Sequence, residues 1–499
     1  MSGRAFPEVR TAAGAVRGRL EDGLSVFRGI PFAQPPVGAA RFAAPRPVEP
    51  WDGVRDALAF GPPVPQEPVG DFAPDLPSGD DWLTVNVWTP EPGPAARLPV
   101  MVWFHGGGYQ FGNAADFDGG RLSREGGLVL VTFNHRIGIE GFARIEGAPA
   151  NRGLLDQIAA LEWVRENIAA FGGDPDQVTA FGESAGAGSI AALMVMDRAR
   201  GLFRRAITQS VPGTFYSDAL ARDIAEVMAA ELGLRPTVGD LSGVDPRELP
   251  LAGAELSSRM PEFADRWGPV RSPHAPVVDG EILTTTPWDG LARGAARDIE
   301  LVAGHNRDEY RLFLLLMGLF GAVDDDMATQ ALRTFGPGAD PAQAYRAAFP
   351  DASAEHLFEL VQSDWLFRMP SLHLAEAHTA GGGRAHVYEL TWAAPAEGMD
   401  LGACHGLGIP LTFGVLDDTV GSLLIGPTPP PEAEKLSAHI RAAWTSFATT
   451  GNPGWPGYET ERRLVQILDA EPTVTAYPEE ASRRLWQNHR FDPLEVRKP

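Results

Sequence analysis

The chain has 499 residues, of which 44% are hydrophobic and 21% are charged, as in an ordinary soluble enzyme. Its formal net charge of −23 argues against DNA or RNA as a partner, because binding these requires clustered cations along the phosphate backbone. Its one cysteine, Cys404, excludes an intrachain disulfide.

From the sequence we expect neither a signal peptide nor a membrane-spanning segment. Residues 1–18 lack the apolar core that a signal peptide needs. The apolar stretch LFLLLMGLF (312–320) is about half the length that crosses a membrane. We therefore expect a cytoplasmic protein that binds neither membrane nor nucleic acid, and we expect it to be a monomer.

The segment between residues 81 and 196 predicts strands that alternate with helices. Two of its apolar runs are continuous, which is typical of strands buried on both faces. One helix is indicated by apolar residues at spacings of three and four. This alternation favours an α/β fold with a large, mostly parallel sheet flanked by helices. The strands are expected at 81–90, 98–104, 128–135 and 177–181, and the helices at 154–170 and 185–196.

Beyond residue 211 the pattern is looser and richer in helix-forming segments. Strand-like pieces interrupt it at 298–306 and 384–392. No low-complexity linker separates this part from the rest of the chain. We therefore predict one domain over residues 1–499, in which helical insertions at roughly 212–275 and 311–400 cap the active site.

The stretch FGESAGAG (181–188) places Ser184 between a predicted strand and a predicted helix. In that context the G-x-S-x-G pattern predicts a nucleophile elbow, a sharp turn that lifts the serine oxygen out of the sheet. Gly182 and Gly186 suit this turn, because side chains there would collide with neighbouring backbone. The alternative is an ordinary glycine-rich turn. We interpret Ser184 as the nucleophile.

A second glycine-rich stretch, HGGG (105–108), directly follows the strand predicted at 98–104. Acyl transfer creates an alkoxide, which needs fixed hydrogen-bond donors where its charge forms. Consecutive glycines let backbone N–H groups approach that oxygen without obstruction. We predict the N–H groups of Gly107, Gly108 and Ala185 as the donors. Taken alone, HGGG favours a tight turn that needs positive φ, but its place 76 residues before the elbow favours the oxyanion role.

A serine nucleophile needs a base, and in hydrolases with this elbow the acid and then the histidine follow the serine. We select His405, because its glycine-flanked loop GACHGLGIP (402–410) lets an imidazole reach a neighbouring serine. His373 and His378 are expected on the surface of a helix. The other histidines after residue 309 are His356, His386, His439 and His489.

The orienting acid is expected in GHNRDEYRLF (304–313), just after a predicted strand. Asp308 and Glu309 compete for this role, and the alternative is a solvated loop that carries charge. Strand ends and spacing do not choose between the two carboxylates.

Several stretches in a fixed order resemble the type-B carboxylesterase family, the carboxylesterase and cholinesterase lineage of α/β-hydrolases. Within that family the likeness is to bacterial members, including p-nitrobenzyl esterases and actinobacterial carboxylesterases. The resemblance implies an α/β-hydrolase fold and ester hydrolysis. The stretches that carry it are FRGIPFAQPPVGAARF, DDWLTVNVWTP, VMVWFHGGGYQFG, NRGLLDQIAALEWVRENIAAFGGDPDQVTAFGESAG, GLFRRAITQS, GHNRDEY, GACHGLGIPLTFG and WTSFATTGNPGWPGY.

The resemblance also implies roles for single residues. It places the acid on Glu309, with Asp308 beside it, and the histidine on His405. Glu183 matches the glutamate before the nucleophile, which supports the site electrostatically in the family, and Ser210 matches the serine of a QSG block. The ion pairs that it implies are Arg136 with Asp156 and Arg41 with Asp80.

This chain departs from the family pattern at three places. The family often joins two cysteines where this chain has Val64 and Trp82, and the joint absence of both suits a reducing compartment. Val211 follows Ser210 where the family has glycine, which affects the pocket wall. Tyr109 follows HGGG, where it narrows the pocket if its side chain points inward.

Together these features predict a serine esterase that acts on a small-molecule ester through an acyl-enzyme on Ser184. No cofactor and no metal are expected, because no His, Cys or Asp cluster has ligand spacing. One alternative keeps the triad but acts mainly on amides, carbamates or lactones. A remote alternative is a non-catalytic, cholinesterase-like binding protein.

Overall fold

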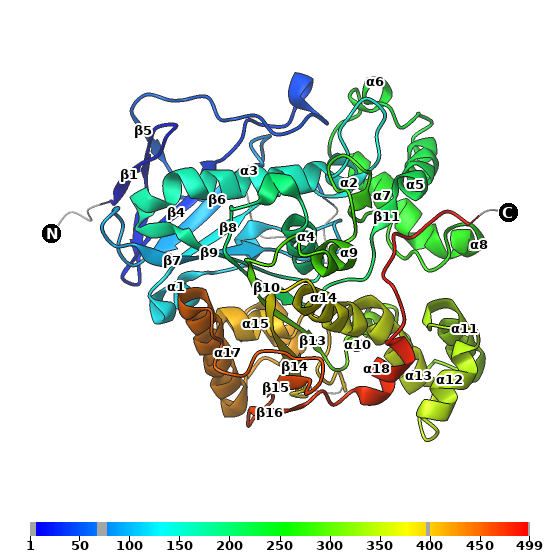
Figure 1. Ribbon diagram of the computed structural model, residues 1–499. Helices are drawn as coiled ribbons and strands as arrows, with labels where there is room; N and C mark the ends of the chain where they lie inside the picture. Colours follow the sequence, from blue (N-terminus) through cyan, green and yellow to red (C-terminus); the bar gives the residue numbers. More distant parts are fainter. Residues whose placement is uncertain (1–5, 67–76, 396–399, 498–499) are drawn as a thin grey trace.

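The computed structural model describes residues 6–66, 77–395 and 400–497, and an 11-stranded sheet forms its centre (Figure 1). The run from β8 through β15 is parallel, and β6, β4, β3 and β16 join it antiparallel. This confirms the predicted large, mostly parallel sheet. The strand order is β16 (Thr473–Ala476), β15 (Leu464–Leu468), β14 (Arg384–Leu390), β13 (Glu300–Asn306), β10 (Arg205–Gln209), β9 (Gly173–Glu183), β7 (Leu98–Phe104), β8 (Val129–Phe133), β6 (Thr84–Thr89), β4 (Leu24–Pro31) and β3 (Arg19–Glu21).

Helices lie on both faces of this sheet (Figure 1). Two small sheets stand apart from it, one of β1 (Glu8–Arg10), β2 (Ala15–Arg17) and β5 (Val54–Asp56), the other of β11 (Tyr216–Ser217) and β12 (Val277–Val278). The helices are α1 (Gly120–Gly126), α2 (Gly138–Phe142), α3 (Arg152–Asn167), α4 (Ala185–Met194), α5 (Asp218–Glu231), α6 (Val238–Leu241), α7 (Leu249–Arg259), α8 (Ala264–Trp267), α9 (Pro287–Ala292), α10 (Arg311–Leu316), α11 (Asp325–Phe335), α12 (Pro341–Ala348), α13 (Ala354–Ser363), α14 (Met369–Ala380), α15 (Gly408–Phe413), α16 (Thr419–Leu424), α17 (Pro431–Thr450) and α18 (Glu480–Trp486).

The continuous apolar run of β7 serves two separate cores. Successive side chains of a strand point to opposite faces of the sheet. Val100 and Val102 pack into the core that holds α3, α4 and α14, whereas Met101 and Trp103 pack into the core that holds α15 and α17. A strand covered on both sides has no polar face, which is why the sequence does not alternate here.

The helix predicted at 154–170 is α3, which begins two residues earlier and ends in a 3-10 turn at Ile168–Phe171. Its apolar stripe faces the sheet, and Leu154 and Leu161 are fully buried. Gly172 stops the segment with φ of 90°, a conformation that L side chains rarely adopt. The strand and helix predicted on either side of Ser184 are likewise present as β9 and α4.

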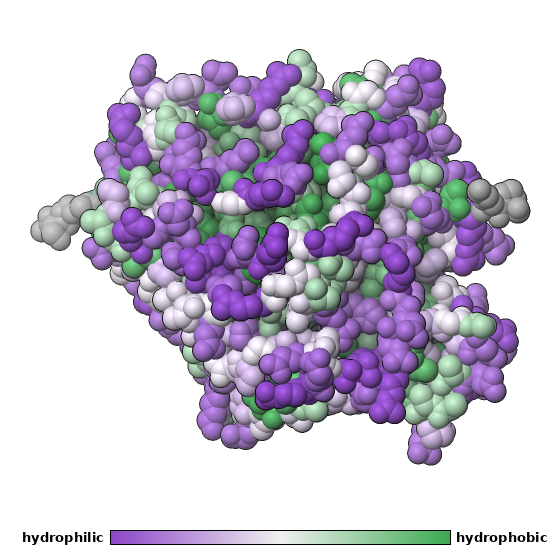
Figure 2. Space-filling model, in the orientation of Figure 1, coloured by the Kyte–Doolittle hydropathy of each residue, from purple (hydrophilic) through white to green (hydrophobic). Residues whose placement is uncertain are grey.

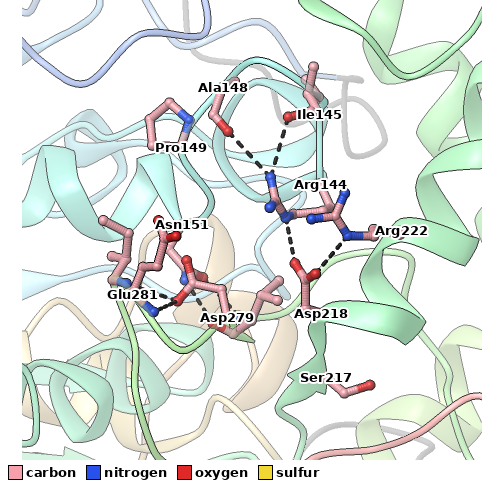
Figure 3. Close-up of polar contacts among 12 residues, drawn as sticks. Arg144, Ile145, Ala148, Pro149, Asn151, Ser217, Asp218, Arg222, Asp279 and Glu281 are labelled. Carbon is pink, nitrogen blue, oxygen red and sulfur yellow. Dashed lines mark hydrogen bonds and ion pairs between the residues drawn. The ribbon is translucent and has the colours of Figure 1, made fainter.

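The first expected insertion contains α5 to α8 and is held to the core by charged and polar contacts (Figure 3). Arg144, after α2, donates to Asp218 at the start of α5 over 2.5 Å, and Arg222 donates to the other carboxylate oxygen over 2.6 Å. Asn151 exchanges two hydrogen bonds with the backbone of Val277, at 2.8 and 2.7 Å. These contacts hold the insertion near its start and just beyond its end.

One of the two implied ion pairs is present and the other is wrong. Arg136 donates to both carboxylate oxygens of Asp156 over 2.8 Å, and both side chains are fully buried. Arg41 instead pairs with Glu140 at 2.8 Å, because its buried guanidinium points towards α2, whereas Asp80 is exposed at the surface.

The two positions where the family often has cysteines belong to one apolar cluster in this chain. Val64 and Trp82 form a small buried cluster with Ile137. The face shown in Figure 2 is mainly hydrophilic, in keeping with the high net charge. Among the described residues, no helix combines the length and the apolar composition needed to cross a membrane.

Candidate active site

The candidate site lies at the carboxyl ends of the parallel strands, where loops from distant parts of the chain meet. Ser184 follows β9 directly and caps α4 with φ of 53° and ψ of −123°, a strained conformation for a residue with a side chain. A Cβ on Gly182 would lie 2.7 Å from the carbonyl oxygen of Phe104, and one on Gly186 would collide with the same oxygen. Because both residues are glycines, the turn can pack directly against the carboxyl end of β7.

The HGGG turn lies beside this elbow. A Cβ on Gly106 would lie 3.3 Å from the Cβ of Ser184, so the two segments are in contact. Gly107 and Gly108 adopt φ of 105° and 59°. Within the described residues, no hydrogen-bond acceptor is recorded for their N–H groups or for that of Ala185. Three donors are thus left without an internal partner around one side of the serine.

Glu309, fully buried after β13, is held by three hydrogen bonds. Its Oε2 lies 2.6 Å from Nδ1 of His405, which donates in the tautomer that leaves Nε2 free. Its Oε1 accepts from the hydroxyl of Ser210 over 2.6 Å and from the N–H of Asn306 over 2.8 Å. A carboxylate bonded in this way fixes the imidazole orientation.

The neighbouring carboxylate, Asp308, points elsewhere. It accepts from the N–H of Ala403 over 2.8 Å and pairs with Arg307 at 3.2 Å. The structure therefore distinguishes the two carboxylates between which sequence patterns did not choose. Glu309 contacts His405, whereas Asp308 binds the backbone of the loop that precedes His405.

A second glutamate reaches the other face of His405. Oε1 of Glu183 lies 3.2 Å from Nε2, an ion-pair contact without hydrogen-bond geometry. Burial raises the pKa of Glu183 to about 7, with the charge of Glu309 adding to it and that of His405 opposing it. Burial works against the charged form of His405, but the charges of Glu183 and Glu309 outweigh it and raise its pKa above the usual value.

Two phenylalanines enclose the imidazole. The ring of Phe367 stacks on His405 with centroids 4.1 Å apart, and that of Phe313 lies at 5.4 Å. Phe367 belongs to a short π-helix at Asp364–Arg368, between α13 and α14. No motif marks it, although a π-helix within a helical segment is frequent at functional sites.

Three other residues that the sequence brings to notice are buried. His378 is buried, with Nε2 2.9 Å from the carbonyl oxygen of Ile299, so its placement on the surface was wrong: its helix packs against the sheet. Tyr109 is buried and its ring packs against Phe142 at 4.7 Å, in the core. Cys404 is buried, and burial raises the pKa of its thiol to about 12.

The described residues contain no group of three or more His, Cys, Asp or Glu side chains placed to hold a metal ion. What the candidate site offers is a strained serine, an imidazole between two carboxylates, and unbonded N–H groups. This is the equipment of nucleophilic acyl transfer.

Comparisons with known proteins agree with that chemistry. A model of the Carboxylesterase family matches residues 5–486. The chain is 36% identical to the para-nitrobenzyl esterase of Bacillus subtilis, covering 95% of this chain and 97% of the relative. It is 33% identical to the phenmedipham hydrolase of Pseudarthrobacter oxydans, covering 94% and 96% of the two chains.

Solved structures show the same likeness. A carboxylesterase of Geobacillus stearothermophilus matches with a TM-score of 0.85 and 34% identity, covering 96% of this chain and all of the other (100%). A PNB esterase matches with a TM-score of 0.84 and 36% identity, covering 96% and 99%.

Proposed function

This chain belongs to the carboxylesterase family and is an ester-hydrolysing enzyme with an α/β-hydrolase fold, and we propose that it works through an acyl-enzyme on Ser184. The observation that carries this proposal is the 2.6 Å contact between Glu309 and His405, at the same edge of the sheet as the strained Ser184. His405 takes the proton of Ser184 as the oxygen attacks the ester carbonyl, and Glu309 stabilises the imidazolium.

The oxyanion that forms is stabilised by the N–H groups of Gly107, Gly108 and Ala185. Their lack of an internal acceptor within the described residues supports this role. Ala185 also opens α4, where the helix dipole favours negative charge. His405 then gives its proton to the leaving alcohol. In the second step it takes a proton from water as the water oxygen attacks the acyl carbon, and it returns this proton to Ser184 as the bond between Oγ and the acid breaks.

Two further residues act through these groups. Ser210 holds Glu309 in place through its 2.6 Å hydrogen bond. Glu183 stabilises the protonated imidazole from its other face. We also propose that segments 212–275 and 311–400 cap the site, since Phe313 and Phe367 of the second segment already contact His405.

The test is the rate of p-nitrophenyl acetate hydrolysis by Ser184→Ala, with Ser189→Ala as the matched control. Ser189 is also buried in α4, one turn further along, and its oxygen accepts from Gln157 at 3.1 Å. We expect kcat to fall by at least ~10⁴-fold in the first variant and to change little in the second. Full activity of the Ser184 variant would contradict the proposal.

A second candidate function, in which the same residues act mainly on amides, carbamates or lactones, is separated by matched substrates. One of the relatives is named for the hydrolysis of phenmedipham, so the family is not confined to one substrate. We expect the p-nitrophenyl ester to be cleaved much faster than the p-nitroanilide with the same acyl group, because an amine is the poorer leaving group. Faster anilide cleavage would favour the second candidate.

A further inference from the structure

A cavity of about 260 Å³ lies between α2, α7 and the turn that follows HGGG. The two helices run side by side in the upper right of Figure 1. None of the residues proposed above for catalysis or the oxyanion lines this cavity. It is therefore a space distinct from the candidate active site, although its wall includes Gln110 and Phe111, whose N–H groups bond to the carbonyl of Gly107.

The most unusual group in the cavity wall is His274. It is buried, with 2% of its surface exposed, and neither ring nitrogen has a hydrogen-bond partner among the described residues. Burial lowers the pKa of His274 to about 3, so the ring is neutral near pH 7. A neutral imidazole presents one donor and one acceptor. Buried polar groups are nearly always bonded, so an occupant that bonds to one ring nitrogen would supply a partner that the described residues do not.

The position of His274 is held from outside the cavity. Its carbonyl accepts a hydrogen bond from the hydroxyl of Ser272. The next two residues, Ala275 and Pro276, lead into β12. There the side chain of Asn151 forms two hydrogen bonds with the backbone of Val277. His274 therefore lies in the cavity wall on a well-anchored segment.

A second unbonded atom lies in the same wall. Oε2 of Glu140 is buried and has no partner among the described residues, whereas Oε1 pairs with Arg41. The negative charge of the Glu140 carboxylate would repel an anionic ligand. A cationic ligand would compete with the Arg41 guanidinium, which already neutralises that charge. The wall therefore favours a neutral ligand that can donate a hydrogen bond.

The rest of the lining is mainly apolar, including side chains of Ile137, Ile139 and Leu249. An apolar cavity of about 150 Å³ is enough to bind benzene. The space here accommodates a single substituted ring with room to spare. An apolar body with one hydroxyl group matches the apolar lining and supplies a hydrogen-bond partner for one ring nitrogen of His274.

We propose that this cavity is a second small-molecule site that binds a neutral hydroxylated compound of about one ring, a phenol or a similar alcohol, with its hydroxyl on His274. The site does not depend on the reactivity of Ser184, and its test needs no turnover. Binding of 4-fluorophenol and of 4-fluorotoluene to the full chain is followed by ¹⁹F NMR.

Three variants localise the binding. His274→Phe keeps an aromatic ring but removes both hydrogen-bonding groups, so 4-fluorophenol should bind about three- to tenfold more weakly while 4-fluorotoluene does not weaken. Gly253→Leu fills the space, and both ligands should be lost. Gly253→Ala is its control: the added Cβ lies 3.5 Å from the His274 ring, an ordinary contact, so both ligands should still bind.

No binding to the native chain would overturn the proposal and would mean that the cavity holds water only. Binding that is equal in all variants would also overturn it, since the ligand would then sit elsewhere. Esterase rate and thermal unfolding check that each variant folds. If His274→Phe does not fold, a native crystal soaked with 4-bromophenol decides, because the bromine signal lies either in this cavity or outside it.

Discussion

Replacing Glu183 with glutamine is expected to move the acid limb of the kcat/KM profile for ester hydrolysis to lower pH. The base, His405, works only when neutral. Glu183 and Glu309 together raise its pKa above 6.5, so activity in the native enzyme should fall as pH decreases through a value above 6.5. Glu183→Gln removes one of the two charges and lowers the pKa of His405.

The size of the shift follows from the contact between Glu183 and His405. Two unit charges 3.2 Å apart interact by about 5 kcal/mol at an effective dielectric of 20, which is an upper limit. Glu183 itself has a pKa of about 7 and is only partly ionised where His405 titrates. We therefore expect a shift of roughly one pH unit, equivalent to about 1.4 kcal/mol.

The assay is kcat/KM for p-nitrophenyl acetate from pH 5 to 9 in the native enzyme, Glu183→Gln and a control. Glu359→Gln is the control, because Glu359 is also buried with a pKa raised to about 7 but bonds to Ser363. Only Glu183→Gln should shift the limb. An unmoved limb in this variant, or the same shift in the control, would refute the electrostatic reasoning.

Three other outcomes are expected. Ser210→Ala, which removes a hydrogen bond to Glu309, should lower kcat about tenfold without changing thermal unfolding much; an unchanged kcat would contradict the positioning role. Gly107→Ala should lower kcat more than KM changes, because its Cβ collides with the carbonyl of Phe111 and displaces the donor turn, whereas native kinetics would show that the turn is not needed. Asp156→Ala should destabilise the fold by about 3–5 kcal/mol in urea unfolding, because it leaves a buried guanidinium unpaired, and a loss below 1 kcal/mol would argue against this.

Sequence patterns predicted the features that depend on neighbours along the chain. The elbow at Ser184 and the HGGG turn are each a contiguous motif that can be read directly from the chain. The space limits differ: a Cβ on Gly107 would meet the nearby carbonyl of Phe111, whereas Cβ atoms on Gly182 and Gly186 would meet the carbonyl of Phe104 in β7. The buried strands were predicted from short apolar runs, because a strand covered on both faces carries no polar side. The resemblance to a known family added the identities of the acid and the base.

Features that join distant segments were not predictable in the same way. Arg41 reaches Glu140 rather than Asp80, and the direction of a long side chain is decided by packing. Phe367 stacks on His405 from a π-helix that no pattern marks. His378 was expected at the surface but is buried, because its helix, α14, packs against the sheet.

The sequence by itself thus determined the α/β class, the positions of the strands and helices between residues 81 and 196, and the two glycine turns of the candidate site. Only the tertiary structure decided that Arg41 pairs with Glu140, that Phe367 stacks on His405, and that His274 lies in the wall of a cavity. The physical reason is that parallel strands bring their carboxyl ends to one edge. Loops from segments about a hundred residues apart, such as those of Ser210 and Glu309 (99 residues) and of Glu309 and His405 (96), meet there at distances that no local spacing encodes.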